Sequence, residues 1–250
     1  MIKKIKKRIE KEQFHPSWLG VFVNPFFIAR NGLRKSIDKL GKEITGKTLD
    51  AGCGTKPYEN LFASSEYVGL EFDTGIDVEK KSADHYYDGK TFPFADKEFD
   101  SVVTNQVLEH VFNPKEFLSE INRVLKTNGK LLITVPFVWD EHEQPFDYAR
   151  YSSFGLKSLL EVSGFEILIQ EKSVNNIAVI FQLLNGYIYK ITRRIPIIKQ
   201  AAVIFIMAPL TIIGLLLAAV VPSNNDLYLD NVILASRNNP DCCREKKTDV

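Results

Sequence analysis

The middle of the chain alternates between short apolar runs and segments with apolar residues at helical spacing. The short runs, each typical of a buried strand, are residues 47–52, 66–73, 99–105, 130–137 and 165–173. A helix is predicted over residues 113–129, with Asn113 as its cap, Pro114 in its first turn and Gly129 as its stop, and another over residues 152–164. This alternation predicts an α/β fold built on a doubly wound parallel sheet.

The first apolar run leads into a glycine-rich turn, LDAGCGTKPYE, at residues 49–59. Pro57 indicates that a helix follows, so the stretch is expected to be a strand–turn–helix unit. A dinucleotide fingerprint would need a third glycine where Pro57 stands, and the carboxylate of Asp50 would repel a pyrophosphate. That carboxylate, with close backbone approach at Gly52 and Gly54, instead suits a ligand that carries a positive amine. A turn that holds no ligand is the alternative.

A second carboxylate stands near the end of the next apolar run. Glu71 follows Gly52 by 19 residues, close to the spacing at which a carboxylate binds a ribose diol. Asp73 is the second choice for this role, and a solvated acid at a strand end is the alternative reading of Glu71.

Two more polar positions fall at strand ends. Asp88, which is followed by Gly89, could accept a hydrogen bond from an adenine amino group or merely cap a turn. Asn105 ends the run at residues 99–105 and is a further candidate for cofactor binding. Ligands of open α/β sheets bind at the carboxyl ends of the strands, so these side chains are expected at one edge of the sheet.

In this order the motifs resemble class I S-adenosylmethionine-dependent methyltransferases. The resemblance rests on Asp50 with its glycine turn, Glu71, Asp88 with Gly89, FPFADKEFDSVVTNQVLEHV and LKTNGKLLITVPF, over about residues 46–170. The nearest group is the one around ubiquinone and menaquinone methylation and the sugar methyltransferases of bacterial surface glycans. It implies a Rossmann-like, mostly parallel seven-stranded sheet whose last strand, expected at residues 227–236, runs antiparallel.

The resemblance also implies roles for the candidate residues. Asp50, Gly52 and Gly54 would hold the methionine part of S-adenosylmethionine, Glu71 would bind its ribose, and Asp88 with Gly89 would border its adenine. This cofactor has a sulfonium, an ammonium and no phosphate, so carboxylates around the site favour it over a dinucleotide. Lys56 departs from the family, which usually has a third glycine there.

The acceptor site and its base are expected in FVWDEHEQPFDYARY, residues 137–151. His142 is the first choice for the base because the ordinary pKa of histidine lies nearest neutral pH. His110 is the second choice, since LEHV resembles the Glu-His pair associated with a metal in ubiquinone-pathway O-methyltransferases. Gln106 replaces an acid of that pattern, so no metal is predicted. A solvated charged loop, and a structural role for His110, are the alternatives.

An apolar insertion separates residues 165–173 from the expected last strand. Residues 201–221 contain no charged residue and would form a helix about 31 Å long, enough to span a bilayer core, although Pro209 and Gly214 are expected to break it. A single crossing is awkward because the last strand must rejoin the sheet on the same side.

Two crossings, with residues 176–189 as the other arm, would carry basic residues across the membrane. Lys190, Arg193, Arg194 and Lys199 would then lie outside, against the positive-inside bias. The favoured interpretations are a helical hairpin in the membrane interface or a re-entrant segment. A dimer interface and an ordinary buried helix are the alternatives.

The amino-terminal stretch favours membrane contact as well. Ile2, Ile5 and Ile9 form one helical stripe, and the first 12 residues hold six basic and two acidic side chains, which predicts a basic amphipathic helix at an anionic surface. A solvated charged terminus is the alternative. The stretch lacks the apolar core of a secretory signal, and the three cysteines form no CxxC pair. A cytoplasmic protein, peripheral or monotopic on the inner face of the membrane, is expected.

Five segments are therefore expected. They are an amphipathic and aromatic segment at 1–45, the cofactor-binding core at 46–175, the apolar insertion at 176–222, the last strand at 223–237 and a disordered tail at 238–250. Membrane contact is assigned to residues 1–14 and 176–222. The net charge of +1 gives no indication of nucleic-acid binding.

The sequence thus predicts an S-adenosylmethionine-dependent methyltransferase that acts on the oxygen of a small-molecule, sugar or lipid-linked glycan acceptor. The alternatives are a non-catalytic cofactor-binding scaffold at the membrane and, less favoured, an NAD-dependent oxidoreductase. Acids, a histidine and aromatics in one loop are needed by an enzyme and not by a scaffold. The acceptor, the methylated atom and the oligomeric state are not determined by the sequence.

Overall fold

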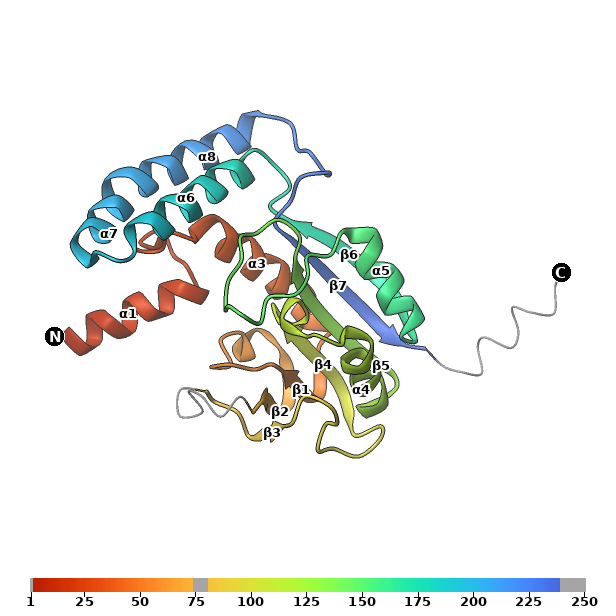
Figure 1. Ribbon diagram of the computed structural model, residues 1–250. Coiled ribbons are helices and arrows are strands. Elements are labelled where there is room, and N and C mark those ends of the chain that lie inside the picture. The colour runs from red at the N-terminus through yellow and green to blue at the C-terminus, as the bar shows by residue number, and fades with distance from the viewer. Residues whose placement is uncertain (1, 74–80, 239–250) are drawn as a thin grey trace. The chain divides into compact units, whose positions relative to one another are not determined.

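A computed structural model describes residues 2–73 and 81–238 (Figure 1). The expected tail at 238–250 and its cysteines lie almost entirely outside the described residues. The chain divides into two compact units. The first contains residues 1–36, 137–141 and 172–230, and the second contains residues 37–136, 142–171 and 231–250.

The second unit is built on a seven-stranded sheet with the order β3-β2-β1-β4-β5-β7-β6. The strands are β1 (Thr45–Ala51), β2 (Ala63–Phe72), β3 (His85–Tyr87), β4 (Phe99–Asn105), β5 (Leu125–Pro136), β6 (Phe165–Ser173) and β7 (Asp230–Arg237). The pairs from β3 to β5 are parallel, and Figure 1 shows β7 running opposite to β6. The predicted Rossmann-like α/β class with an antiparallel late strand is confirmed.

Helices α4 (Pro114–Val124) and α5 (Ser153–Val162) pack against this sheet. The predicted apolar face of α4 is buried, with Leu118 and Ile121 fully inaccessible, because residues three and four apart share one side of a helix. Ser152 caps α5 by accepting a hydrogen bond from the backbone N–H of Gly155, as its sequence indicated. Three single-turn 3-10 helices, η1 (Gly41–Glu43), η2 (Glu59–Leu61) and η4 (Leu108–His110), complete the described part of this unit that positions the site.

Several predicted boundaries are wrong, and three of these errors have a clear physical reason. The helix that begins at Pro114 ends at Val124 and not at Gly129, because Leu125 already pairs with Phe99 as the first residue of β5. Asn128 takes the left-handed turn, with φ +62°, that glycine was expected to supply. The last strand begins at Asp230, three residues later than expected at its amino end.

The third error concerns Pro57. No α-helix follows the glycine turn, and the chain forms only the single turn η2 before it enters β2. Eight residues separate the turn at Gly54 from β2 at Ala63, which leaves no room for a longer helix.

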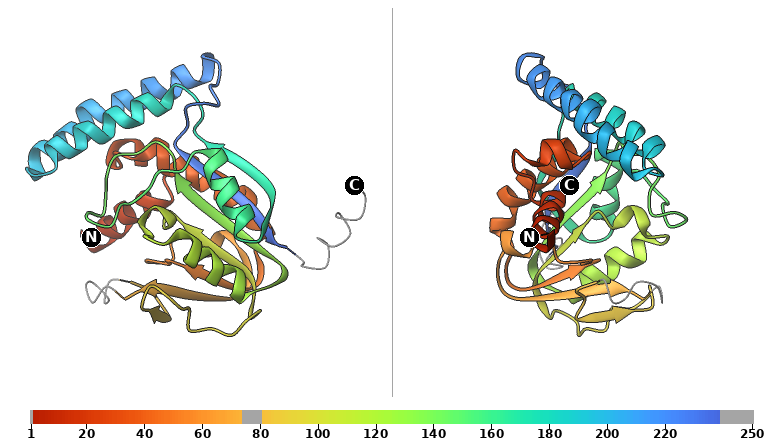
Figure 2. Two further views of the ribbon diagram at one scale, coloured as in Figure 1. Left: turned by 45° about the vertical axis from the view of Figure 1, so that its right-hand side comes forward. Right: turned by 90° about the vertical axis from the view of Figure 1, so that its left-hand side faces the viewer.

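The first unit is helical. It contains α1 (Ile2–Phe14), α2 (Gly20–Val23), most of α3 (Phe27–Leu40), and a hairpin of α6 (Ala178–Thr192) against α7 (Pro196–Ala202), the π-turn η5 (Val203–Met207) and α8 (Ala208–Val220) (Figure 2). The predicted helical hairpin is present. The expected breaks at Pro209 and Gly214 are absent, since residues 196–220 form one continuous helix.

Local chemistry explains this continuity. The π-turn lies directly before Pro209, which lacks a backbone N–H, so the irregular turn accommodates the missing hydrogen bond. A side chain at Gly214 would lie 2.8 Å from Phe181, so glycine allows α6 and α8 to approach closely. Between the same helices, buried Asn185 donates a hydrogen bond of 2.8 Å to Thr211.

Candidate functional site

The carboxyl ends of the parallel strands bring the predicted polar residues to one edge of the sheet. Asp50 and Asn105 lie at the ends of the neighbouring strands β1 and β4, and Glu71 lies at the end of β2 on the other side of β1. Asp88 directly follows β3. Their common edge follows from the parallel register, in which Asp50 pairs with both Gly69 and Val103.

The glycine turn uses the left-handed conformation at three alternating positions. Gly52, Gly54 and Lys56 have φ of +83°, +50° and +52°. At Gly52 a side chain would collide with Val107, whose Cγ2 would lie 2.4 Å from the new Cβ. At Gly54 a new Cβ would meet nothing within 4 Å. Gly52 is therefore required by packing, whereas Gly54 borders open space that a ligand could fill.

Glu71 ties the turn to β2. Its Oε2 accepts a hydrogen bond of 2.9 Å from the backbone N–H of Gly54, and its Oε1 forms an ion pair of 2.9 Å with Lys81. Each carboxylate oxygen has two lone pairs, so these contacts leave acceptor capacity for a diol. Asp73, the second choice for this role, lies one residue beyond the end of β2.

Asp50 is the buried acid of the site. Only 4% of the residue is exposed, and its Oδ2 accepts a hydrogen bond of 2.7 Å from the hydroxyl of Tyr67. Burial raises the pKa of Asp50 to about 7, the Tyr67 hydrogen bond opposes this rise, and the charge of Glu71 adds to it. A positive group bound beside Asp50 would favour its ionised form. Tyr67 was missed in the sequence, because its partner lies on the neighbouring strand.

Asp88 and Asn105 make local contacts at the same edge. The Asp88 carboxylate is exposed and accepts hydrogen bonds from the backbone N–H groups of Lys90 and Thr91, which lower its pKa. It therefore caps its turn, one of the two roles that the sequence allowed, while Gly89 in that turn has φ +86°. Asn105 accepts a long hydrogen bond of 3.4 Å from the Thr134 hydroxyl on β5.

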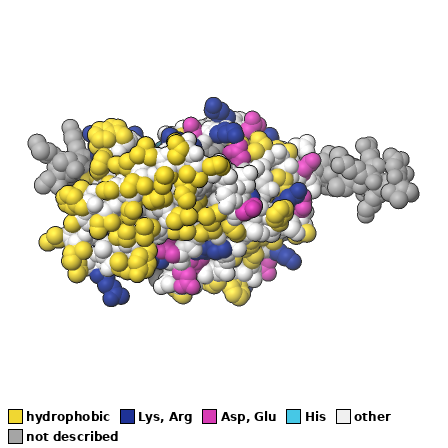
Figure 3. Space-filling model, turned by 90° about the horizontal axis from the view of Figure 1, so that it is seen from above, with side chains coloured by type: hydrophobic (Ala, Val, Ile, Leu, Met, Phe, Trp, Pro, Cys, Tyr) yellow, Lys and Arg dark blue, Asp and Glu magenta, His cyan; other side chains and the backbone are white. Residues whose placement is uncertain are grey.

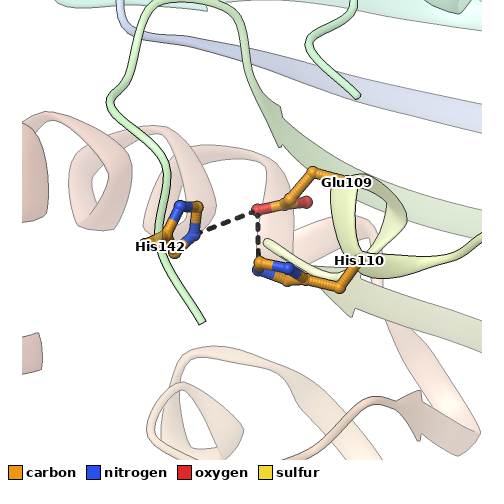
Figure 4. A group of neighbouring side chains, drawn as sticks. All are labelled: Glu109, His110 and His142. Atoms are coloured by element: carbon orange, nitrogen blue, oxygen red, sulfur yellow. Dashed lines mark ion pairs between the residues drawn. The ribbon is translucent and has the colours of Figure 1, made fainter. Parts of the chain in front are cut away.

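Both candidate histidines meet beside a buried glutamate (Figure 4). The rings of His110 and His142 lie 4.7 Å apart in an edge-to-face arrangement. Their Nε2 atoms lie 3.7 and 4.0 Å from Oε1 of Glu109, which is fully inaccessible. The sequence named Glu109 only as a neighbour of His110, because the burial of a side chain in a single-turn helix has no periodic signal.

Further contacts orient the two rings. His110 Nδ1 lies 2.6 Å from the Phe146 carbonyl, which can only accept, so Nδ1 carries a proton and Nε2 of the neutral ring keeps its lone pair. His142 Nδ1 lies 3.3 Å from Asp147 Oδ2, and the same oxygen accepts from the His142 backbone N–H at 2.9 Å. Arg150 binds both oxygens of Asp147 and, as the largest influence, lowers its pKa. Asp147 therefore stays ionised 3.3 Å from His142 Nδ1, and Nη2 of Arg150, which can only donate, lies 3.4 Å from the same nitrogen.

The same three side chains have the donor set of a cation site. The ligand atoms of Glu109, His110 and His142 all lie within 4.8 Å of one another. Ligands about 2.1 Å from a metal lie at most about 4.2 Å apart, so a small closure would suffice. The prediction that no metal binds here, which was drawn from Gln106, stays open to test.

Comparison with known proteins places the site in context. Residues 49–133 match the family model described as a methyltransferase domain. A probable S-adenosylmethionine-dependent methyltransferase of Mycolicibacterium smegmatis is 30% identical over 143 residues, which cover 52% of this chain and 56% of that protein. The mitochondrial ubiquinone biosynthesis O-methyltransferase of Bos taurus is 34% identical over 133 residues, covering 43% of this chain and 34% of that protein. The chain spans about half the length of the curated relatives it matches.

Solved structures share the fold at lower identity. The [4+2]-cyclase SpnF superposes with a TM-score of 0.54 and 18% identity, over 82% of this chain and 81% of the cyclase. At this identity the likeness establishes the fold alone. Solved structures with this fold include a cyclase as well as methyltransferases, so the fold does not determine the reaction.

Proposed function

Because the chain carries a class I S-adenosylmethionine-dependent methyltransferase domain, we propose that it binds S-adenosylmethionine at the strand edge and methylates an oxygen of a sugar or lipid-linked acceptor at the cytosolic face of a membrane. The observation that carries the cofactor part is the open space at Gly54, whose backbone N–H donates to half-buried Glu71, in the turn that follows buried Asp50. Asp50 and the glycine turn hold the methionine part, Glu71 binds the ribose diol, Asp88 and Gly89 border the adenine, and Asn105 is a further cofactor contact on the other side of β1.

The charge of the site supports this cofactor. A sulfonium and an ammonium offset the cost of ionising buried Asp50, whereas a pyrophosphate would add negative charge beside two carboxylates. An NAD-dependent oxidoreductase is therefore the weaker candidate.

His142 is the proposed base. In the reaction the acceptor oxygen attacks the methyl carbon, the carbon–sulfur bond breaks, and S-adenosylhomocysteine leaves as a neutral thioether. The acceptor's proton passes to Nε2 of His142, while Asp147 stabilises the resulting imidazolium through Nδ1. His110, whose Nε2 faces the same glutamate, is the second candidate.

The hairpin supports the membrane part of the proposal. Residues 196–220 form a 25-residue helix with a mean hydropathy of 2.7 in its most apolar window, and only 28% of that window is buried. By length and composition such a helix could cross a membrane, whereas the core helix of a globular protein is mostly buried. We propose that it dips into the membrane from the cytosolic side, and that α1 adds contact through its basic residues.

The test of the catalytic assignment uses S-adenosylmethionine with a tritiated methyl group and a lipid extract of the source cell envelope. We expect His142→Ala to lower kcat about 10²- to 10⁴-fold without changing cofactor affinity, because the residue acts on the acceptor. His15→Ala, in the helical unit, is the matched control and should stay active. Inactivity of His110→Ala together with normal turnover of His142→Ala would reverse the choice of base.

A metal determination separates this mechanism from a cation site. If His142 is a base, the purified active protein contains no stoichiometric divalent metal, and a chelator leaves kcat unchanged. One bound metal per chain that is lost together with activity would instead assign Glu109, His110 and His142 as ligands.

A further inference from the structure

Helix α6 contains a glycine for which packing gives no reason. A glycine in a helix interior costs about 1 kcal/mol relative to alanine. Gly214 on α8 has a reason, because a side chain there would collide with Phe181. Gly186 is buried, yet a Cβ built on it would meet nothing within 4 Å. Gly186 therefore faces a space that its missing side chain leaves open.

That space is a pocket of about 310 Å³ within the helical unit. Gly186 lines it together with the apolar side chains of Leu183, Trp139 and Tyr187. Phe26 contacts the Trp139 ring edge-on, with centroids 5.7 Å apart, which fixes the indole at the pocket wall.

The polar groups of the pocket are already engaged. Asp140 and Lys190 form an ion pair of 2.8 Å, so the charges that line the pocket cancel. The buried amide of Gln182 accepts from the backbone of Ala29 and donates to the carbonyl of Pro25, each at 3.1 Å. With cancelled charges and apolar walls, the pocket suits an uncharged apolar group and not a phosphate or a carboxylate.

The pocket is continuous with an exposed apolar surface. Tyr187 lines it and is 64% exposed, and Leu184 and Ile191 are exposed on the same helix. Figure 3 shows the wide apolar field to which the side chains of the hairpin contribute. A ligand that reaches the pocket across this surface would come from an apolar environment such as a lipid bilayer.

We propose that this pocket binds the first part of the hydrocarbon chain of a membrane amphiphile. The proposal goes beyond the proposed function, because it assigns a second binding site and the chemical class of its ligand. A volume of about 310 Å³ is near the lower end for ligand pockets, so it holds a chain segment and not a whole lipid.

The test follows the fluorescence of Trp139 in the full-length protein on vesicles of phosphatidylcholine and phosphatidylglycerol. Trp18→Phe removes the only other tryptophan, which is 72% exposed. The probe is 11-bromoundecan-1-ol, whose bromine quenches an indole that it contacts. We expect saturable quenching, and we expect Gly186→Leu, whose Cβ would meet no atom within 4 Å, to raise the half-saturating concentration at least tenfold.

Leu184→Phe is the control, because it enlarges an apolar side chain of α6 outside the pocket and should quench like the parent. Equal quenching in Gly186→Leu, or quenching of the parent that never saturates, would overturn the proposal, since the alcohol would then act from the bilayer alone. Relief of this quenching by a water-soluble sugar nucleotide, together with no relief by unbrominated undecan-1-ol, would overturn the proposal as well. If Gly186→Leu unfolds, Leu183→Phe replaces it.

Calorimetry with S-adenosylmethionine on the same samples keeps the two proposals apart. Gly186→Leu should bind the cofactor like the parent protein. If the parent binds no cofactor, the proposed function fails, whereas the quenching data still decide whether the pocket binds a chain.

Discussion

Helices α4 and α8 are both rich in apolar residues, but α4 buries them within the protein and α8 leaves most of the large ones exposed. On α4 the side chains of Phe117, Leu118, Ile121 and Val124 are buried against the sheet. On α8 the large side chains face outward, and Leu216 and Val220 are 65% and 77% exposed. Burying apolar surface is favourable by roughly 25 cal/mol per Å² in either case. The sheet unit thus satisfies this tendency within its own chain, whereas the hairpin depends on an apolar environment outside it.

The largest expected effect tests that dependence. Phe205 is 76% exposed, so Phe205→Glu with Leu216→Glu should leave the fold intact. A carboxylate at membrane depth costs about 2.5–3.5 kcal/mol, so each change should weaken vesicle binding about a hundredfold. Sedimentation with phosphatidylcholine–phosphatidylglycerol vesicles measures this loss. Phe112→Glu, on an equally exposed phenylalanine of the sheet unit, is the control, and unchanged sedimentation of the double variant would leave a dimer interface as the role of the hairpin.

The second prediction compares the two glycines of the turn. Gly54→Ala should reduce S-adenosylmethionine affinity at least tenfold, because its methyl group enters open space, and its φ of +50° should lower the free energy of unfolding by only about 1 kcal/mol. Gly52→Ala should lower the free energy of unfolding by about 2 kcal/mol or more, because φ is +83° and Val107 is in the way. Calorimetry and thermal unfolding measure the two quantities. Wild-type affinity in Gly54→Ala would mean that the open space is not the cofactor site.

More of the fold than of the site could be predicted from the sequence. Strands at residues 99–105 and 165–173 have the predicted boundaries, because apolar runs between turn residues are local signals. The helix boundaries predicted from Gly129 and Pro57 were wrong. At Gly129 the pairing of Leu125 with β4 ends the helix early, and at Pro57 the connection to β2 is too short for a helix. Tertiary context decided both cases.

At the site, residue types and strand ends sufficed to name Asp50 and Glu71. Tyr67 beside Asp50, and Asp147 behind His142, could not be found in this way, because their roles depend on contacts across strands and within an irregular loop. The pocket at Gly186 could not be predicted from the sequence either. A glycine in a helix can allow close packing or border an open space, and the sequence does not show which.

A smaller effect is expected from pH. With a folded pKa of about 7 against an ordinary 3.8, Asp50 keeps its proton in the folded protein between pH 4 and 7, so it makes the fold less stable as pH rises through that window. The bound cofactor favours the ionised form, so its affinity should rise roughly tenfold from pH 6 to pH 8. Asp50→Asn should abolish this dependence, and Tyr67→Phe should move its midpoint to higher pH. An unchanged pH profile in Asp50→Asn would assign the titration to another group.

The central claim is that the carboxylate edge of the sheet binds S-adenosylmethionine, and calorimetric titration at pH 8 tests it most directly. We expect S-adenosylmethionine to bind one site per chain, and Glu71→Gln to weaken it about 10- to 100-fold through lost charged hydrogen bonds. Asp73→Asn, one residue beyond β2, should bind like the parent. Tight binding of NAD with no heat from S-adenosylmethionine would contradict the account.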